Sequence, residues 1–534
     1  MSKKRITTTE PIYEGLDLTA SNRDYAVFLP SISSIYVKML SSNLMGKRTG
    51  LPSGLRNGWK DLDFLGTQSD LFTYRWALYS AGHAEWDLVK SDQMESMVQK
   101  RDRSRNVIVG DSGGFQFATG VLKWPWQPKK KQDLAGMCAD RDQTRMDLLR
   151  WLEHTADWSM IFDFPPGGID LYGYDEKTGI PLHPGLKSFR DCLDGSIENA
   201  EFFIKHRSPG KTKFLNVLQG RNQQEGDIWW DACKDWPFES WAFANIQGHS
   251  TALNLRRLII MRDGGYLEGK DWLHYLGNGK IKAATTLTTI QRCLRKHVNP
   301  NVTLSYDAAS PFVMTAKGQM YNTYVINPQQ MAFKGGPIPD SKQLKGSTML
   351  LKDYALQQLK ASKLLPQQQQ NTFDDLFDHS MVERTPVVSS EISKRITLGD
   401  ICVKGYEDLN AKELDETVEA MQHALGIVEY KEFQQKNKKY PSALDGLSYL
   451  LLMNHNVELH IRACQEACSW LDQPLNVASQ HLPSEVLEFK DLCEEIFTSE
   501  KPMSLIEANW TLLANGTGMD ANNFKLSMNI EEIV

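Results

Sequence analysis

The stretch NVIVGDSGGFQ at residues 106–116 shows the pattern that decides the fold. A short apolar run, typical of a buried strand, ends in Asp111, and two glycines then open a turn. Six further apolar segments end in a polar or glycine-rich turn in the same way: AVFLP (26–30), SMIFDFPPGG (159–168), KFLNVLQGR (213–221), WAFANIQGHS (241–250), LHYLGNGK (273–280) and VTLSYDAAS (302–310). Several are followed by a helix-like stretch, and repeated units of this kind predict a parallel sheet.

A parallel sheet either stays open or closes into an eight-stranded barrel. Polar or glycine-rich residues follow at least five of the segments, as expected at the mouth of a barrel, whereas an open doubly wound sheet concentrates them at one switch point. We therefore predict an α/β fold of the TIM (β/α)8 barrel class. Helices are expected at 144–154, at 196–206 with Ser196 as the N-cap, and at 285–297.

The pattern changes after residue 312, which predicts three regions. Residues 1–312 form the barrel core, 313–440 a large insertion with helices near 358–378 and 411–425, and 441–534 the last barrel helix (444–471) and an acidic, mostly helical C-terminal tail. Residues 401–534 hold 22 acidic and 10 basic side chains, a balance of −12, so the overall charge of −6 leaves +6 on residues 1–400. This charge balance allows a polyanion to approach the first 400 residues.

The composition favours a cytoplasmic protein. No apolar run approaches the roughly 18 residues of a membrane-spanning helix, and the start of the chain lacks the apolar core of a signal peptide. The eight cysteines among 534 residues form no CxxC pair and no dense framework. We expect a reducing compartment and no membrane partner.

Two aspartates end strands of the series. Asp111 and Asp307 can divide labour at the barrel mouth, one as nucleophile and the other as proton shuttle, which is the chemistry of glycosyl transfer. The alternatives are an ordinary tight turn at Asp111 and a helix N-cap or surface ion pair at Asp307.

Six motifs together carry a resemblance to a family. DSGGFQ (111–116), FDFPP (162–166), VLQG (217–220), NIQGHS (245–250), YLGNG (275–279) and SYDAASP (305–311) resemble, in order, those of the tRNA-guanine transglycosylases. The chain is most similar to the DpdA-type branch, which puts 7-deazaguanine bases into DNA. The resemblance covers roughly residues 20–312 and one later helix.

The resemblance implies a pentosyltransferase that replaces guanine by a 7-deazaguanine base. Asp307 matches the nucleophile and Asp111 the general acid/base. Asp163 would read the N1–H and 2-amino edge of the base, Gln219 and the backbone around Gly248 its carbonyl side, and Phe115 and Leu276 would sandwich it. The full set of implied substrate-binding residues is Ser112, Phe115, Asp163, Gln219, Gly248, His249, Leu276 and Gly277. Core packing is the alternative for Phe115.

The nucleic-acid contact candidates lie in KWPWQPKKK at 123–131, where tryptophans sit between lysines: Lys123, Trp124, Trp126, Lys129, Lys130 and Lys131. A solvated loop with one tryptophan tucked into a neighbouring helix is an equal alternative.

Three departures from the family shape the prediction. The tRNA-acting relatives carry a zinc subdomain with a CxCxxC cluster, whereas Cys402 is the sole cysteine between Asp307 and residue 444. His455 lies in a segment that resembles the family helix with a zinc ligand. The weak candidates for metal ligands are therefore Cys402, His455, Cys464 and Cys468. Without the thiolate cluster we predict no zinc and no other cofactor.

His249 stands where the tRNA enzymes usually have a glutamate that recognises an aminomethyl cation, so an uncharged 7-substituent, a nitrile as in preQ0, fits better. The long interval after Ala308 is the third departure. Together they favour DNA over tRNA as the substrate. A non-catalytic nucleic-acid-binding subunit and a barrel enzyme acting on a small metabolite are further alternatives. Participation of a helper protein or a second copy stays open.

Overall fold

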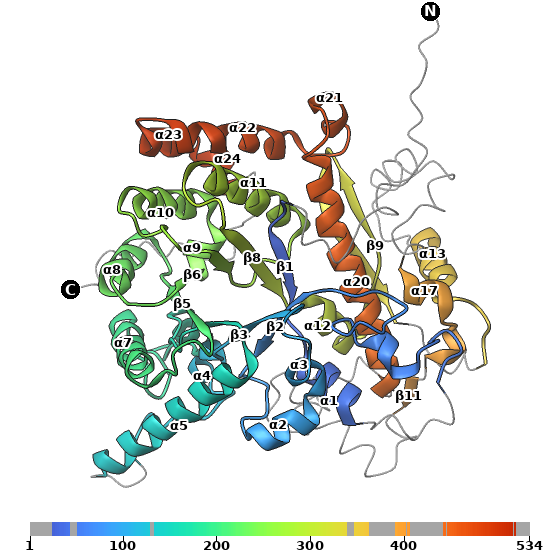
Figure 1. The fold of residues 1–534 in the computed structure, drawn as a ribbon, viewed down its shortest axis with the longest axis horizontal. Coiled ribbons are helices and arrows are strands. Elements are labelled where there is room, and N and C mark those ends of the chain that lie inside the picture. The colour runs from blue at the N-terminus through green and yellow to red at the C-terminus, as the bar shows by residue number, and fades with distance from the viewer. Residues whose placement is uncertain are drawn as a thin grey trace, which may run out of the picture. The chain divides into compact units, whose positions relative to one another are not determined.

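The computed structural model describes most of the chain (Figure 1). The described residues are 24–42, 51–128, 133–338, 346–361, 390–401, 403–405, 442–444, 446–515 and 517–518. They belong to two compact units, which we call the barrel unit and the second unit. The barrel unit takes its described residues from the ranges Asp24–Ser41, Trp76–Ala309 and 484–518, and the second unit takes its described residues from Ser42–Arg75 and Ser310–Pro483.

Eight parallel strands form the centre of the barrel unit (Figure 1). They are β1 (Val27–Pro30), β2 (Trp76–Ser80), β3 (Val107–Asp111), β4 (Trp158–Met160), β5 (Lys213–Leu218), β6 (Ser240–Phe243), β7 (Trp272–Tyr275) and β8 (Thr303–Ala308). Neighbours pair in the order β1-β8-β7-β6-β5-β4-β3-β2, and a parallel bridge between Ser31 and Leu78 joins the two ends. The predicted TIM barrel is confirmed.

Seven of these strands overlap the predicted apolar segments, to within one residue at their starts, and β2 lies outside them. The strand β2 has the sequence WALYS and places Ser80 beside Asp111 in the parallel register. It therefore contributes directly to the mouth of the barrel.

Helices follow the strands and surround the sheet (Figure 1). They are α1 (Ser34–Ser42), α2 (Leu88–Met94), α3 (Ser96–Gln99), α4 (Gly114–Ala118), α5 (Leu134–Thr155), α6 (Gly167–Tyr172), α7 (Phe189–His206), α8 (Gln223–Cys233), α9 (Asn245–His249), α10 (Thr251–Asp263) and α11 (Ile281–His297). The three predicted helices correspond to the C-terminal parts of α5, α7 and α11, which all begin earlier than expected.

The predicted N-cap of α7 is wrong. The helix begins after Ser188, whose hydroxyl accepts from the Asp191 N–H at 3.2 Å. Ser196 instead lies buried within the helix, where its hydroxyl donates to the Cys192 carbonyl at 2.7 Å and accepts from the Phe164 N–H at 2.9 Å. Ser196 therefore ties α7 to the loop after β4, a role that local sequence does not distinguish from capping.

The C-terminal helices α22 (Ser484–Thr498), α23 (Pro502–Ala508) and α24 (Trp510–Asn515) belong to the barrel unit. Phe489, Leu492 and Ile496 of α22 are buried. Glu494 pairs with His297 on α11 at 2.9 Å, and Glu485 pairs with Lys282 on the same helix at 3.0 Å. The predicted helical character of the C-terminal region is confirmed over these described helices.

The second unit is built around the long helix α20 (Gly446–Trp470), which agrees with the helix predicted at 444–471. Beside it are η2 (Gly58–Leu62), α12 (Ser310–Ala316), the antiparallel pair β9 (Gln319–Asn327) and β10 (Gln330–Pro337), α13 (Leu351–Ala361), α17 (Glu391–Arg395), η4 (Leu398–Asp400), the antiparallel pair β11 (Val403–Gly405) and β12 (Ser442–Leu444), and α21 (Leu475–Ala478). The helix expected at 411–425 and most of that expected at 358–378 lie outside the described residues.

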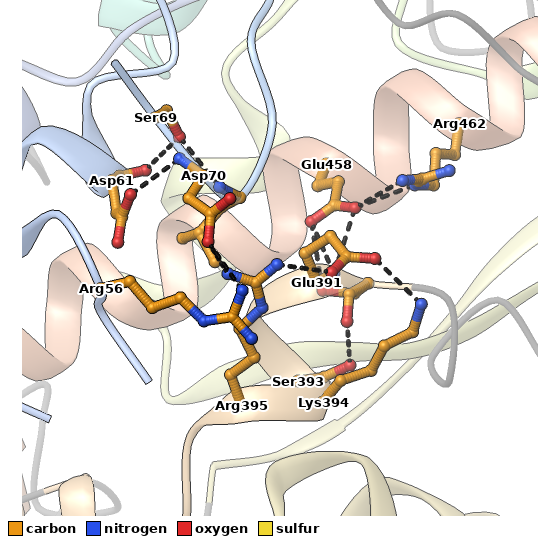
Figure 2. Close-up of polar contacts among 12 residues, drawn as sticks. Arg56, Asp61, Ser69, Asp70, Glu391, Ser393, Lys394, Arg395, Glu458 and Arg462 are labelled. Atoms are coloured by element: carbon orange, nitrogen blue, oxygen red, sulfur yellow. Dashed lines mark hydrogen bonds and ion pairs between the residues drawn. The ribbon is translucent and has the colours of Figure 1, made fainter. Parts of the chain in front are cut away.

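Charged side chains link the segments of the second unit (Figure 2). Arg395 pairs with Asp70 at 2.8 Å and with Glu391 at 3.0 Å. Glu458 is fully buried on α20, where it pairs with Arg462 at 2.9 Å and accepts from the Glu391 N–H at 3.0 Å. Burial raises the pKa of Glu458, and the neighbouring Arg462 opposes that rise. Across the described segments of both units, no helix is long and apolar enough to cross a bilayer.

Candidate active site

The two aspartates of the predicted pair lie at the carboxyl ends of two strands of the same barrel, β3 and β8. Asp111 is the last residue of β3, and Asp307 is the penultimate residue of β8. Because all eight strands are parallel, their carboxyl ends open on one face of the barrel, where the loops that follow them build the site. The two carboxyl groups are close enough that the charge of Asp307 raises the pKa of Asp111.

Asp111 is held by hydrogen bonds from two elements. The Ser80 hydroxyl donates to Asp111 Oδ2 at 2.6 Å, and the Gly113 N–H donates to Oδ1 at 3.2 Å. Burial raises the pKa of Asp111 and the charge of Asp307 adds to the rise, whereas these two hydrogen bonds oppose it. A carboxyl group in these surroundings keeps a proton more readily than an exposed aspartate does, as a general acid requires.

Asp307 has different partners. Its Oδ1 accepts from the Gly277 N–H at 2.8 Å and lies 3.5 Å from Nε2 of His274. The side chain of Asp307 is 13% exposed, so the carboxylate is reachable from the mouth. His274 is fully buried on β7, and its Nδ1 lies 2.9 Å from the Ser305 hydroxyl on β8. One oxygen of Asp307 is thus oriented by the β7 region, an arrangement that suits a nucleophile.

A chain of three polar side chains lies across the ends of β4, β5 and β6. The Gln219 amide Nε2 donates to Asp163 Oδ2 at 2.7 Å, and the Asn245 amide Nδ2 donates to Gln219 Oε1. Asp163 and Gln219 are 6% and 4% exposed, so both are desolvated. Burial raises the pKa of Asp163 to about 7, against the lowering by the Gln219 hydrogen bond, and the charge of Asp111 raises it further.

The glycine pair after Asp111 lets the backbone of this turn pack closely against the loop that carries Asp163. Gly113 has φ +76°, a left-handed conformation that favours glycine. A Cβ on Gly114 would overlap the main-chain oxygen of Asp163. The turn therefore brings the backbone of α4 directly against the loop that carries Asp163.

The two residues expected to sandwich the base both reach solvent. Phe115 on α4 is 52% exposed, which excludes core packing for its ring. Leu276 is half-buried, and its N–H donates to the Phe243 carbonyl at 3.0 Å. An exposed phenylalanine in the loop after β3 is available to stack on a flat ligand.

Ser112 and Gly248 have structural partners of their own. The Ser112 hydroxyl is buried and donates to the Ile161 carbonyl at 3.0 Å. The Gly248 N–H donates to the Ala244 carbonyl at 3.3 Å, and its carbonyl accepts from the Asn278 amide at 2.9 Å. These groups hold the loops of the mouth together in the structure.

His249 lies near Gly277. A Cβ on Gly277, which has φ +74°, would lie 3.6 Å from Nε2 of His249. Burial lowers the pKa of His249, the charge of Asp307 opposes this, and Lys280 lowers it further. The imidazole is therefore mainly neutral at neutral pH.

The two tryptophans of the predicted nucleic-acid segment differ in their exposure to solvent. Trp124 is buried at 7% exposure, with its ring 5.3 Å from that of Phe162 and the Arg145 guanidinium 5.3 Å from its face, so its indole is part of the core. Trp126 is half-buried, with its ring 4.7 Å from that of His183. Lys123 is exposed, and Lys129, Lys130 and Lys131 lie outside the described residues.

The weak metal candidates are placed in the second unit. His455 is buried, with Nε2 2.8 Å from the Tyr321 carbonyl and Nδ1 3.0 Å from the Ser390 hydroxyl, and burial lowers its pKa to about 4. Cys464 and Cys468 are buried and are not joined in a disulfide, and Cys402 lies outside the described residues. Within the described part of the chain, no three His, Cys, Asp or Glu side chains are grouped so as to hold a metal ion.

Three residues of the mouth are absent from the sequence prediction: Ser80, His274 and Asn245. Ser80 belongs to the strand that was not predicted. His274 lies within the quoted segment LHYLGNGK, but as a strand residue rather than a loop residue. Asn245 alone carries a local signal, because an asparagine directly after a strand tolerates the left-handed conformation.

Comparison with known proteins does not assign this chain to a family. No family model matches this chain, and no curated protein matches it. The assignment of an activity therefore depends on the motifs and on the geometry of the barrel mouth.

Proposed function

We propose that the protein exchanges guanine in a nucleic acid, DNA in preference to tRNA, for a 7-deazaguanine base. The observation that carries this proposal is the pair Asp111 and Asp307, which end β3 and β8 of one barrel in different surroundings. Asp307 is oriented by a backbone N–H, and Asp111 has a raised pKa. Two carboxyl groups with separated roles are what a double displacement at a sugar carbon requires.

In the first displacement the Asp307 carboxylate attacks C1′ of the target nucleotide. The C1′–N9 bond breaks, its electron pair leaves with guanine, and Asp111 gives a proton to the departing base. A covalent glycosyl ester on Asp307 results. The base must first be turned out of its stack, which costs a few kcal/mol and is offset by contacts to the phosphates.

In the second displacement the incoming 7-deazaguanine base enters the same pocket. Asp111, now ionised, takes the N9 proton, N9 attacks C1′, and the ester bond to Asp307 breaks. Inversion occurs twice at one carbon, so the β configuration is retained.

Asp163 and Gln219 support recognition of a guanine-like edge. An ionised Asp163 accepts from the N1–H and the 2-amino group, and Gln219 lies beside it within hydrogen-bond distance. The neutral His249 supports an incoming base with an uncharged 7-substituent, because an imidazole with a lowered pKa attracts an aminomethyl cation poorly.

The second unit supports the preference for DNA. His455, in the segment that resembles the zinc-bearing helix of the tRNA enzymes, uses both ring nitrogens within the protein. Its neighbour Asn456 donates to the Pro311 carbonyl at 2.9 Å and accepts from the Tyr321 N–H at 2.8 Å. Hydrogen bonds thus connect this helix to its surroundings where the tRNA enzymes use a metal.

The test is incorporation of labelled guanine into duplex DNA and into tRNA by the purified full chain. We expect label in DNA, and a loss of about 10³-fold or more in Asp307→Asn and of about 10²-fold or more in Asp111→Asn. Asp235→Asn is the matched control, because Asp235 is exposed and follows α8 on the side away from the mouth. Label in tRNA alone would refute the preference for DNA, and undiminished exchange in both aspartate variants would refute the mechanism.

The 7-substituent is tested by competition between two acceptor bases. We expect the nitrile base to be incorporated faster than the aminomethyl base. Faster incorporation of the aminomethyl base would contradict the role given to His249.

A further inference from the structure

Asn245 has an unusual backbone. Among the residues that the structure describes, it is the one non-glycine residue with a left-handed conformation, at φ +47°. It begins α9, one residue after the end of β6, and is half-buried at the barrel mouth. Residues are held in such sparsely populated conformations where the surrounding structure requires them, often at functional sites.

The side chain of Asn245 begins the chain of hydrogen bonds that ends at Asp163. Its Nδ2 donates to Gln219 Oε1, and Gln219 Nε2 donates to Asp163 Oδ2 at 2.7 Å. An ionised carboxylate only accepts hydrogen bonds, so it requires the nitrogen of Gln219 on its side. Asn245 supplies the donor that the oxygen of Gln219 then needs. The orientation of the Gln219 amide is therefore determined from both ends.

The orientation of the Gln219 amide determines which hydrogen-bonding groups the pocket presents to a bound base. With Nε2 beside Asp163, Gln219 has a second N–H to offer a carbonyl oxygen, and Asp163 accepts from the neighbouring ring N–H. If the hydrogen bonds ran in the opposite direction, the single O–H of a protonated Asp163 would donate to Gln219 Oε1, and Gln219 would present this oxygen, rather than an N–H, to the base. An oxygen in that position matches the 6-amino group of 2,6-diaminopurine rather than the 6-oxo group of guanine.

We infer that Asn245 is a specificity-determining positioning residue, which selects a 6-oxo over a 6-amino base by fixing the direction of the hydrogen-bond chain through Gln219 to Asp163. The inference rests on the proposed function, because it concerns the base that the same pocket takes. Asn245 acts through Gln219 and makes no contact with the reacting atoms.

The backbone allows two informative variants. Aspartate and glycine both tolerate φ +47°, so Asn245→Asp and Asn245→Gly keep the turn. Asn245→Asp replaces the amide N–H donor by a carboxylate acceptor. This acceptor draws Nε2 of Gln219 toward itself and so reverses the direction of the hydrogen bonds between the three side chains. Asn245→Gly removes the donor without replacing it. Asn222→Asp is the matched control, because Asn222 caps α8 through an oxygen that an aspartate also provides, and it adds the same charge after β5.

The measurement is calorimetric binding of guanine and of 2,6-diaminopurine to the full chain, together with exchange into DNA. We expect the wild type and Asn222→Asp to prefer guanine, and the ratio of the two affinities to fall about tenfold or more in Asn245→Asp and by a smaller factor in Asn245→Gly. Melting curves confirm that each variant is folded. If Asn245→Asp fails to fold, Asn245→Gly decides.

Three outcomes distinguish failure of the inference from failure of the proposed function. Wild-type affinity ratios in both Asn245 variants, with exchange intact, would overturn the inference and leave the proposed function standing. Selective guanine binding by the wild type without any exchange would overturn the proposed function, and the affinity ratios would still decide the role of Asn245. A wild type that binds neither base would overturn both.

Discussion

At the scale of single residues, burial sets the chemistry of the mouth. Asp111 and Asp163 are both desolvated, and each has a raised pKa. Their partners differ, because Asp111 accepts from a hydroxyl and a backbone N–H, whereas Asp163 accepts from an amide. A raised pKa favours proton transfer by Asp111, but it opposes recognition of ring N–H groups by Asp163, which must be ionised to accept both.

Guanine binding should therefore depend on pH. The pKa of Asp163 in the free protein is about 7, so its carboxyl group holds a proton below that pH and loses it above. We expect the affinity for guanine to fall about tenfold per pH unit below pH 7 and to level off above pH 8. Calorimetric titration between pH 5.5 and 8.5, with Asp163→Asn as the control without this dependence, measures the effect. An affinity that stays constant over this range would show that Asp163 does not read the base as a carboxylate.

At the scale of elements, the loops after the strands are packed against each other rather than only against solvent. Gly114 at the start of α4 approaches the main chain of Asp163 so closely that no side chain fits between them. Ser112 of the same turn donates to Ile161, just after β4. The DSGGFQ turn is thus packed directly against the segment that carries FDFPP, although Ser112 and its partner Ile161 are 49 residues apart in the sequence.

Although it adds one methyl group, Gly114→Ala should lower both the stability of the protein and its base-exchange activity. The new methyl group would push the Asp163 loop away, at a cost of about 1–3 kcal/mol in the free energy of unfolding and with loss of base exchange. Gly179→Ala is the control, because Gly179 has φ +68° and open space around it, so only backbone strain of about 1 kcal/mol is expected and exchange should persist. Chemical denaturation and exchange assays compare the two. Equal exchange in both variants would contradict the close approach.

In the second unit, α20 depends on an ion pair in its interior. Arg462→Met leaves Glu458 without its partner cation and should reduce the free energy of unfolding by about 3 kcal/mol at pH 8. The pKa of Glu458 is already raised by burial and rises further in the variant, so the carboxyl group takes up a proton as the pH falls and the loss should shrink toward pH 5. Lys394→Met, which removes an exposed partner of Glu391, should cost less than about 1 kcal/mol. A loss that is independent of pH would contradict an ionised Glu458.

At the scale of the whole molecule, the barrel unit is completed by residues from the end of the chain. The helices α22–α24 follow the second unit in sequence but belong to the barrel unit. Phe489 and Ile496 are almost fully buried, and burial of each such side chain contributes about 1.5–3 kcal/mol. Their sum is comparable to the marginal stability of a typical domain.

A chain that ends at Pro483 should therefore fail to form a stable barrel. We expect loss of the cooperative thermal transition and aggregation, since the α11 surface beneath α22 becomes exposed. A chain that ends at Gly518 keeps the helices α22–α24 and should keep a cooperative thermal transition. A stable, cooperative 1–483 fragment would show that the C-terminal helices are dispensable.

The parts of the molecule that sequence predicted are those in which the information is local. Seven apolar runs marked seven strands, and Asp111 and Asp307 stood out because each directly ends or nearly ends a strand. The start of α7 was misplaced because Ser188 and Ser196 are both serines that could cap a helix, and the long-range contact of Ser196 with the Phe164 N–H is not visible in the local sequence.

Long-range contacts account for what was missed. The burial of Trp124 depends on aromatic rings of the β4 region, and the link from Asn245 to Gln219 spans 26 residues. Hydrogen-bond direction through such a chain depends on the register of three strands, which apolar patterning does not specify.

The central claim is a covalent bond between Asp307 and the sugar of a guanine nucleotide. Incubation of the full chain with a guanine-containing duplex oligonucleotide, without an acceptor base, followed by denaturing electrophoresis and peptide mass spectrometry, tests it most directly. We predict an adduct in which the peptide containing Asp307 carries a strand that has lost one guanine. This adduct should be absent in Asp307→Asn, and addition of a 7-deazaguanine base should release the strand from the protein. No adduct with DNA or tRNA, or one that forms equally in Asp307→Asn, would contradict it.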